Sequence, residues 1–445
     1  PWNFAGPSWP VNKRFKVEAM ANDNAGNSAA ASPREFIYDV NAPSSTIVVP
    51  ASTATFQNAA QIAVLSGRAL DWVNRPSTEA YSGLAPSGIE LQIVHPGGNT
   101  YNGAAFDAGD NWRAVNMTVT DSLDGGSIGV TINSTATWVY PTATPDTWPP
   151  GAGLSQGNVY TVRSRARDRS ANLEAYAAKS FTYDSFAPTT TVTVPAASYY
   201  TRLSAMSGSF QDAVSGINPG DGVQAAVQRN SDGKWWNGAV CGDAGWDPAA
   251  SFAVGTHWKN VNNVFVDTWT WTAADVSYAN LLCYFDSLLA ANASLEFNVF
   301  ARGKDAVGNQ NRPDTAPAGG GALFTIDPIK PSSVATWPVN GSSVTVATSI
   351  ISGIAADASL GVPSGLNRVQ VRISKLNVSG ARWYYKWSLN TWTTADADWL
   401  FVDVDGGPLS PWTKTIPLTA FTGANSGNGW VFQIQSAARD NTLPV

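Results

Sequence analysis

The chain contains short stretches in which apolar and polar residues alternate, and turn residues interrupt them. In the segment FKVEAMA, Phe15, Val17 and Ala19 alternate with more polar neighbours. A period of two residues is typical of a strand with one buried face. A turn follows, because Asp23 can accept backbone N–H groups and Gly26 can adopt a left-handed conformation. The pattern predicts a half-buried strand followed by a tight turn.

This strand and turn recur with a period of about 140 residues. The copies are FKVEAMANDNAGN, YTVRSRARDRSAN, FNVFARGKDAVGN and FQIQSAARDN, beginning at Phe15, Tyr160, Phe297 and Phe432. After each of the first three copies comes a second short strand with an Asp and then a Pro: FIYDVNAP, FTYDSFAP and FTIDPIKP. Proline cannot donate an N–H to a sheet, so it ends the strand and stiffens the link that follows.

Two further motifs recur in the same order. The motif S-G-x-x-x-D begins at Ser66, Ser207 and Ser352. A second motif, Ser-Gly followed by an apolar residue, begins at Ser87, Ser215 and Ser364. Independent motifs that return in order predict repeats, with these boundaries: 1–42, the C-terminal part of one repeat; 43–187 and 188–330, complete repeats; and 331–445, a repeat lacking its last strand. We expect an excerpt of a longer chain, or strand exchange between chains, to complete the outer repeats.

Composition supports an all-β secreted protein. Charged residues make up 13% of the chain and aromatic residues 11%, and there are 19 Trp residues. The net charge of −6 is mild, and no Lys- and Arg-rich stretch predicts a nucleic-acid surface. No apolar stretch approaches the roughly 20 residues that a membrane-spanning helix needs.

The ordered motifs resemble bacterial immunoglobulin-like repeats of large surface proteins and adhesins. The resemblance implies an all-β fold of tandem immunoglobulin-like β-sandwich domains in an elongated array. It implies an extracellular or cell-surface location and a structural role as a stalk, fibre or filament. An adhesin, or a glycan-binding accessory region of a larger secreted protein, is the alternative. Expected partners are neighbouring repeats of one long chain or a second chain bound head to tail, and a glycan or a host or cell-surface ligand.

Recurrent aspartates at the strand ends are the candidate metal ligands. They fall into the pairs Asp23 with Asp39, Asp168 with Asp184, and Asp305 with Asp327. Carboxylates that meet where repeats join could hold a structural Ca²⁺, which takes 6–8 oxygen ligands. The alternative is simple turn capping, which needs one Asp and no ion. No other cofactor is expected.

The remaining candidate chemistry is sparse. Cys241 and Cys283 are predicted to form a disulfide in an oxidising compartment, or else to be two buried thiols. The histidines, His95 and His257, lie in no catalytic motif, so we expect no enzyme. Recurring aromatic residues are predicted to pack in the core, with a sugar-binding platform as the alternative. They form three sets: Tyr101, Trp235 and Trp383; Trp112, Trp258 and Trp399; and Trp138, Trp269 and Trp412.

Overall fold

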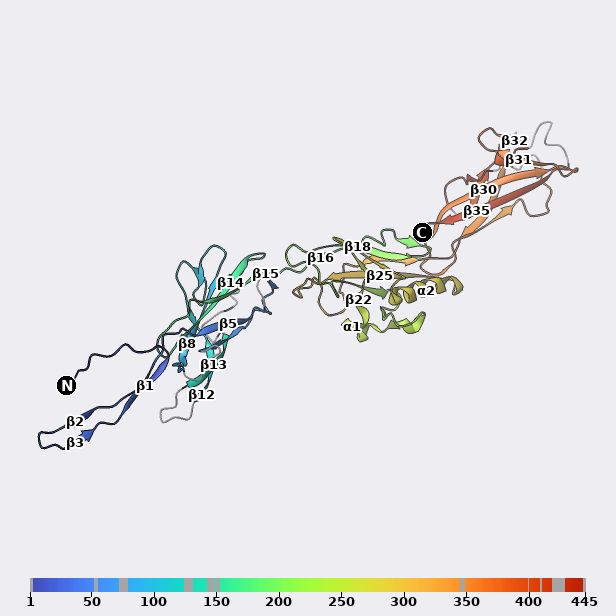
Figure 1. Cartoon of the computed structure of the whole chain (residues 1–445). Coiled ribbons are helices and arrows are strands. Elements are labelled where there is room, and N and C mark those ends of the chain that lie inside the picture. The colour runs from blue at the N-terminus through green and yellow to red at the C-terminus, as the bar shows by residue number, and fades with distance from the viewer. Residues whose placement is uncertain are drawn as a thin grey trace. The chain divides into compact units, whose positions relative to one another are not determined.

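A computed structural model describes residues 3–51, 55–71, 79–123, 131–141, 148, 153–344, 349–398, 400–408, 410–417 and 429–442. These residues form strands joined by turns, with few helices (Figure 1). They belong to two compact units: Pro1–Ala187, Asp212–Asn218 and Asp305–Asn309 in the first, and Pro188–Gln211, Pro219–Lys304 and Gln310–Val445 in the second. The all-β, immunoglobulin-like sandwich class is confirmed, whereas the repeat boundaries stay a prediction. Within the described part, no helix has the length and apolar character to cross a membrane.

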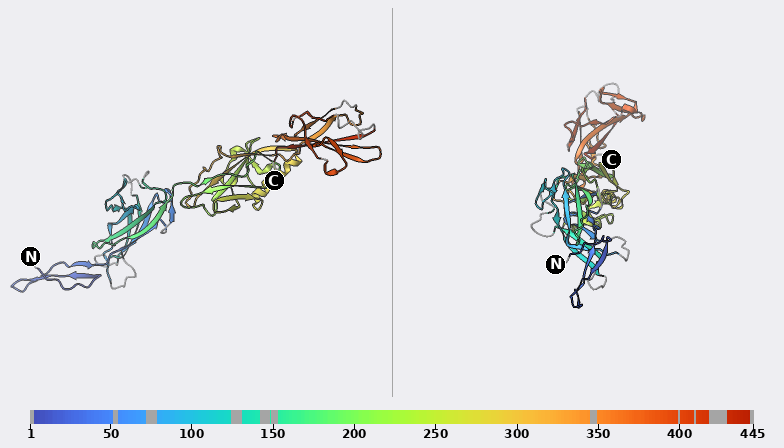
Figure 2. Two further views of the ribbon diagram at one scale, coloured as in Figure 1. Left: turned by 90° about the horizontal axis from the view of Figure 1, so that it is seen from above. Right: turned by 60° about the vertical axis from the view of Figure 1, so that its left-hand side comes forward.

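The first unit begins with a two-stranded ribbon, coloured dark blue in Figure 2. Strand β1 (Lys13–Val17) pairs antiparallel with β4 (Arg34–Tyr38), and β2 (Met20–Asn22) pairs with β3 (Ser28–Ala30). Phe15 lies opposite Phe36, and the two rings stack at 5.4 Å between centroids. The aromatic pair therefore joins the two strands on one face of the ribbon.

The first sandwich consists of two sheets. One has the order β10-β9-β8-β14-β15-β6 with β11 beside β8, and the other has the order β12-β13-β7-β5. The strands are β5 (Ser44–Val49), β6 (Thr55–Gln57), β7 (Leu65–Leu70), β8 (Leu84–Val94), β9 (Thr100–Tyr101), β10 (Phe106–Asp107), β11 (Arg113–Ala114), β12 (Asn116–Leu123), β13 (Thr131–Tyr140), β14 (Val159–Asp168) and β15 (Ala177–Tyr183). Strand β14 alternates buried and less buried residues along its length, as the sequence predicts. Its buried face joins the core that both sheets share.

The second sandwich is built in the same way in the second unit. One sheet has the order β16-β18-β24-β23, and the other has the order β17-β26-β25-β19-β20-β21 with β22 beside β19. The strands are β16 (Thr189–Thr190), β17 (Tyr199–Tyr200), β18 (Ala205–Gln211), β19 (Val223–Arg229), β20 (Trp235–Trp236), β21 (Trp246–Asp247), β22 (Lys259–Asn260), β23 (Asn263–Val264), β24 (Thr268–Thr272), β25 (Ala293–Gly303) and β26 (Ala322–Ile326).

The second sandwich also carries helices, which the sequence analysis did not predict. They are η1 (Asp243–Gly245), η2 (Ala249–Ser251), α1 (Val254–His257) and α2 (Val276–Ala290). The carboxylate of Asp275 caps α2 by accepting the backbone N–H groups of Ser277 and Tyr278. Helix α2 buries Tyr278, Leu281 and Phe285, which are spaced so that they share one helical face. That spacing is the signal for the helix.

The third sandwich has a sheet of order β27-β28-β34 and a second sheet of order β32-β31-β30-β33, with β35 beside β30. Its elements are β27 (Ser332–Trp337), β28 (Ile350–Ala356), β30 (Leu366–Leu376), β31 (Arg382–Lys386), β32 (Thr391–Thr393), η3 (Asp396–Asp398), β33 (Val402–Asp403), β34 (Trp412–Thr415) and β35 (Val431–Asp440). Between β28 and β30, the short strand β29 (Leu360–Gly361) pairs parallel with β25 of the second sandwich. Its core contains Val371, Ile373, Tyr385 and Trp412.

Candidate metal centre

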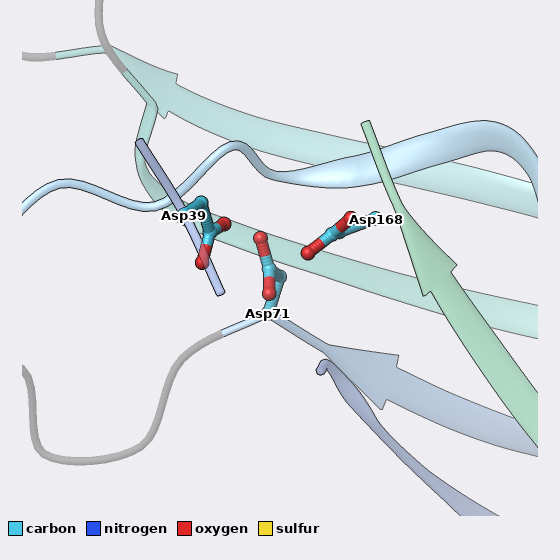
Figure 3. A group of neighbouring side chains, drawn as sticks. All are labelled: Asp39, Asp71 and Asp168. Atoms are coloured by element: carbon cyan, nitrogen blue, oxygen red, sulfur yellow. The ribbon is translucent and has the colours of Figure 1, made fainter. Parts of the chain in front are cut away.

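Three carboxylates converge in the first unit, at the ends of strands that are far apart in the sequence. Asp39 follows β4, Asp71 follows β7, and Asp168 is the last residue of β14. Their side chains are buried, and one carboxylate oxygen from each lies within 4.8 Å of the others. Figure 3 shows the three carboxyl groups pointing toward one another. Three carboxylates at this spacing could hold a metal ion.

Backbone N–H groups hold these carboxylates in place. Asp39 Oδ2 accepts the N–H of Ser82 at 2.7 Å, and Asp71 Oδ2 accepts the N–H of Gly83 at 2.6 Å. Asp168 accepts both the backbone N–H and the side-chain amide of Asn172, at 2.8 and 2.7 Å. A Ser-Gly turn and an Asn turn therefore fix the cluster.

The electrostatics of the cluster show an excess of negative charge. Burial, together with the nearby carboxylates of Asp39 and Asp168, raises the pKa of Asp71 to about 8. Burial also raises the pKa of Asp168, although its hydrogen bonds to Asn172 act in the opposite direction. A bound cation would compensate this charge.

A second cluster, also within the first unit, repeats the first. It consists of Asp184 after β15, Asp212 after β18 and Asp305 after β25, and their oxygens lie within 4.8 Å of one another. Asp184 Oδ2 accepts the N–H of Ser215 at 3.0 Å, and Asp212 Oδ1 accepts the N–H of Gly216 at 2.7 Å.

The aspartate at the end of β25 in this second cluster is held as Asp168 is in the first. Asp305 accepts the backbone N–H and the side-chain amide of Asn309, at 2.8 and 2.7 Å. Burial is the main cause of its raised pKa, and the charge of Asp184 adds to it.

The second unit holds a third, related set: Asp327, Asp357 and Asp440. Asp327 Oδ2 accepts the N–H of Ser364, and Asp357 Oδ2 accepts the N–H of Gly365, both at 2.7 Å. Burial raises the pKa of Asp357, and the charges of Asp327 and Asp440 raise it as well. The other oxygen of Asp357 is buried and has no hydrogen-bond partner among the described residues. The Ser-Gly part of the hydrogen-bond scheme is therefore present three times, whereas Asp440 accepts the N–H and the hydroxyl of Thr442 in place of an Asn.

One predicted motif is corrected by this scheme. The Ser-Gly pair of the first cluster is Ser82-Gly83, not Ser87-Gly88 as the motif search suggests. Gly83 has a φ of 80°, in the left-handed region, and Gly216 and Gly365 have φ angles of 75° and 78°. The two Ser-Gly pairs are five residues apart, so the sequence motif alone could not separate them.

The structure groups the predicted aspartates differently from the sequence analysis. Asp23 lies exposed in the turn of the ribbon, where it accepts the N–H groups of Ala25 and Asn27 and only caps that turn. The predicted pairings Asp23 with Asp39, Asp168 with Asp184 and Asp305 with Asp327 are wrong, because Asp23 lies in no group and the members of the other two pairs lie in different groups. The clustered aspartates that the sequence analysis did not name as candidates are Asp71, Asp212, Asp357 and Asp440. The first three end the S-G-x-x-x-D motif, which was the signal for them.

The recurring aromatic residues differ in burial: Trp112 and Trp383 are half-buried, Trp399 lies outside the described residues, and the last set lies in the cores of the sandwiches. Trp138, Trp269 and Trp412 are each at most 1% exposed. Their faces are therefore closed to a sugar ring, and the core-packing interpretation is the correct one for this set.

The two cysteines, Cys241 and Cys283, form a disulfide with 5.6 Å between their Cα atoms. The bond joins the segment after β20 to helix α2. This covalent link restrains the part of the second sandwich that carries the helices.

Comparisons with known proteins find similarity to solved structures only. No family model matches the sequence. No curated protein matches it either. The similar solved structures include fibronectin(III)-like modules of Clostridium thermocellum CbhA, at 12% identity over 64% of this chain and 94% of that one, with a TM-score of 0.24. They also include the FN1–FN3 domains of chicken CNTN1, at 10% identity over 90% and 93% of the two chains, with a TM-score of 0.24.

A third similar structure concerns the host cell surface retention of a 1.5-MDa bacterial ice-binding adhesin. It is 12% identical over 89% of this chain and 96% of that one, with a TM-score of 0.26. Identities and TM-scores this low carry no argument about the fold or the function of this chain.

Proposed function

We propose that this chain is a structural segment of an extracellular protein, in which aspartate clusters bind Ca²⁺ and stiffen the connections between successive sandwiches. The observation that carries the proposal is the recurrence of one arrangement. In two clusters, an Asp after the F-x-Tyr strand meets the S-G-x-x-x-D aspartate and the aspartate of the next long strand. In the third sandwich, Asp327 and Asp357 accept the corresponding Ser-Gly N–H groups. Simple turn capping does not require three carboxylates to meet.

The donor set suits a hard cation. Each of the two tight clusters offers three carboxylates, and Ca²⁺ takes 6–8 oxygen ligands at 2.3–2.6 Å, with water filling the remaining positions. The residues that would hold the ion are Asp39, Asp71 and Asp168 in one cluster and Asp184, Asp212 and Asp305 in the other. The ion would supply positive charge that links segments distant in sequence.

An extracellular location supports the same proposal. The disulfide between Cys241 and Cys283 needs an oxidising compartment to persist. Extracellular calcium is also abundant enough for modules of modest affinity, with Kd values of about 10⁻⁴–10⁻³ M. Neighbouring repeats of one chain, or a second chain bound head to tail, are the proposed partners.

Thermal unfolding of the chain in Ca²⁺ and in EDTA tests whether the aspartate clusters bind Ca²⁺. A ligand that binds only the folded state stabilises it by about 2.7 kcal/mol at 100 times its Kd, so Ca²⁺ should raise the melting temperature. Asp71→Asn should lose the part of this rise that comes from the first cluster. Asp110→Asn, at an exposed carboxylate outside the cluster that accepts a hydrogen bond from Gln92, should keep it. Equal melting temperatures in Ca²⁺ and in EDTA would refute the proposed binding of Ca²⁺.

Electron microscopy of the purified chain tests the structural role separately. Extended, stiff particles in Ca²⁺ that become more variable in EDTA are expected. Compact particles in both conditions would contradict a stalk or fibre, whatever the ion does to the melting temperature.

Adhesion through a glycan is the second candidate, and half-buried indoles in the third sandwich favour it. Trp383, Trp392 and Trp430 lie near one another around Lys375, whose Nζ is 4.5 Å from the ring of Trp392 and 4.3 Å from that of Trp430. A glycan array should give specific hits that Trp383→Ala removes and that Trp337→Ala, at an exposed tryptophan of β27, retains. An array without hits would remove this candidate.

A further inference from the structure

A short strand of the third sandwich is paired with the second sandwich. Strand β29 runs parallel to the start of β25, and both sandwiches belong to the second unit. The N–H of Leu360 donates to the carbonyl oxygen of Asn292 at 2.9 Å, and the N–H of Val362 donates to that of Ser294 at 3.1 Å. A loop of the third sandwich therefore adds one strand to a sheet of the second sandwich.

Main-chain hydrogen bonds, rather than buried apolar side chains, hold β29 on β25. The side chains of β29 and its neighbour stay in water, since Leu360 is 66% exposed and Val362 is 42% exposed. Gly361, between them, has a φ of 103°, and a Cβ atom there would lie 2.1 Å from the carbonyl oxygen of Ser294. The two backbones therefore approach so closely that only glycine fits at position 361.

The side chain of Asp327, which follows β26, joins the same two sandwiches. Its Oδ1 accepts the hydroxyl of Ser294 in the second sandwich at 2.7 Å, and its Oδ2 accepts the N–H of Ser364 in the third, also at 2.7 Å. The hydroxyls of Ser294 and Ser359 lie 2.5 Å apart. Asp327 and Ser294 are both fully buried, so these hydrogen bonds are shielded from water.

The corresponding segment of the second sandwich is built differently. Residues 212–216 lead there from the aspartate of the S-G-x-x-x-D motif to the Ser-Gly pair; they contain no strand, and their aspartate belongs to one of the two tight clusters. In the third sandwich, residues 357–365 make the same connection, are longer and contain β29. Their aspartate, Asp357, belongs to neither tight cluster found among the described residues. The extra strand is therefore present where the tight cluster is not.

We infer that residues 359–364 act as a clasp that fixes the third sandwich to the second by main-chain pairing, without a bound ion. The clasp gives the chain a connection between sandwiches whose stiffness does not depend on Ca²⁺. The inference is separate from the proposed binding of Ca²⁺ and would stand if the aspartate clusters bound no ion, because every contact that carries it is made by the chain itself.

A distance measurement between two spin labels tests the clasp in the full chain in EDTA. The labels are attached to Val276→Cys in α2 and Ile354→Cys in β28, which replace exposed side chains of the second and third sandwiches. The described part of the chain has no free cysteine that would react as well. Pulsed electron paramagnetic resonance should give a narrow distance distribution that Ca²⁺ does not change. A broad distribution in EDTA would overturn the inference.

Two variants open the clasp in different ways. Gly361→Ala places a methyl group against the carbonyl oxygen of Ser294, and Leu360→Pro removes the N–H that donates to Asn292. Both should broaden the distance distribution. Hydrogen exchange at the N–H of Val362 should become faster by on the order of tenfold, as loss of one or two hydrogen bonds implies. Because the clasp lies outside the hydrophobic cores, both variants should keep the tryptophan fluorescence of the folded chain.

Gly341→Ala is the matched control. Gly341 also has a positive φ, of 78°, but nothing lies within 4 Å of the position that its methyl group would take. This variant should keep the narrow distribution and the slow exchange. A distribution that stays narrow in both clasp variants would overturn the inference. Equal broadening by Gly341→Ala would overturn it too, since the effect would then come from strain in any loop rather than from the clasp.

Discussion

Gly208 lies directly across from Trp269 in the antiparallel pair of β18 and β24. The indole covers the glycine, and its Nε1–H donates to the backbone carbonyl of Thr191 at 3.1 Å. A methyl group on Gly208 would meet both this carbonyl and the indole. The recurrent Gly of the S-G-x-x-x-D motif is therefore required by the recurrent Trp.

Gly208→Ala should destabilise the second sandwich because the added methyl group has no space. Overpacking of a core costs about 1–3 kcal/mol, and contact with a backbone carbonyl favours the upper end. Urea unfolding followed by tryptophan fluorescence measures the change. Gly255→Ala is the matched control, since nothing lies within 4 Å of the position that its methyl group would take. Equal stability of the two variants would show that the sheet adjusts without cost.

In EDTA, the stability of the first sandwich should fall as the pH rises from about 4 to about 8. Burial and neighbouring carboxylates raise the pKa of folded Asp71 to about 8, above its ordinary value of 3.8 in the unfolded chain. The folded state therefore holds its proton over this range while the unfolded state loses it. Asp71→Asn should flatten the profile, and Asp110→Asn should not. A flat profile for the unchanged chain would contradict the charge crowding at this cluster.

The third sandwich should become more stable as the pH rises from about 8 to about 10.5. Burial lowers the pKa of Lys375 from 10.5 to about 8, so the folded state loses the proton before the unfolded state does. Lys375→Met should stabilise the sandwich at pH 7 and remove this dependence. The comparison variant is Lys330→Met, at an exposed position, and it should keep the rise. Urea titrations at several pH values check the slopes, and a slope unchanged by Lys375→Met would refute the assignment.

Replacing both Cys241 and Cys283 by Ser should lower the free energy of unfolding of the second sandwich by about 2–4 kcal/mol. The disulfide closes a loop of 42 residues, which restricts the unfolded chain. Helix α2 should persist, because Tyr278, Leu281 and Phe285 still bury its inner face. Denaturant unfolding and far-ultraviolet circular dichroism measure the two effects. Loss of helical signal in the native variant would show that the disulfide, not the buried face, holds α2 in place.

The sequence by itself determined the local elements and their order. Alternation in FKVEAMA and its copies predicted strands, and Asp, Asn, Gly and Pro marked the turns between them. The S-G-x-x-x-D motif even contained Asp71, Asp212 and Asp357, although their role was not recognised. These signals are readable because strand alternation and turn chemistry depend on neighbours a few residues away.

Only the tertiary structure decided which carboxylates meet. Asp39, Asp71 and Asp168 come from three separate strands, and their proximity depends on sheet order and strand ends, which no local pattern encodes. The same holds for Ser82-Gly83, which was chosen over Ser87-Gly88 because its N–H groups reach Asp39 and Asp71. A carboxylate cluster is a property of where strands end in space, and that is fixed by the packing of the two sheets rather than by sequence spacing.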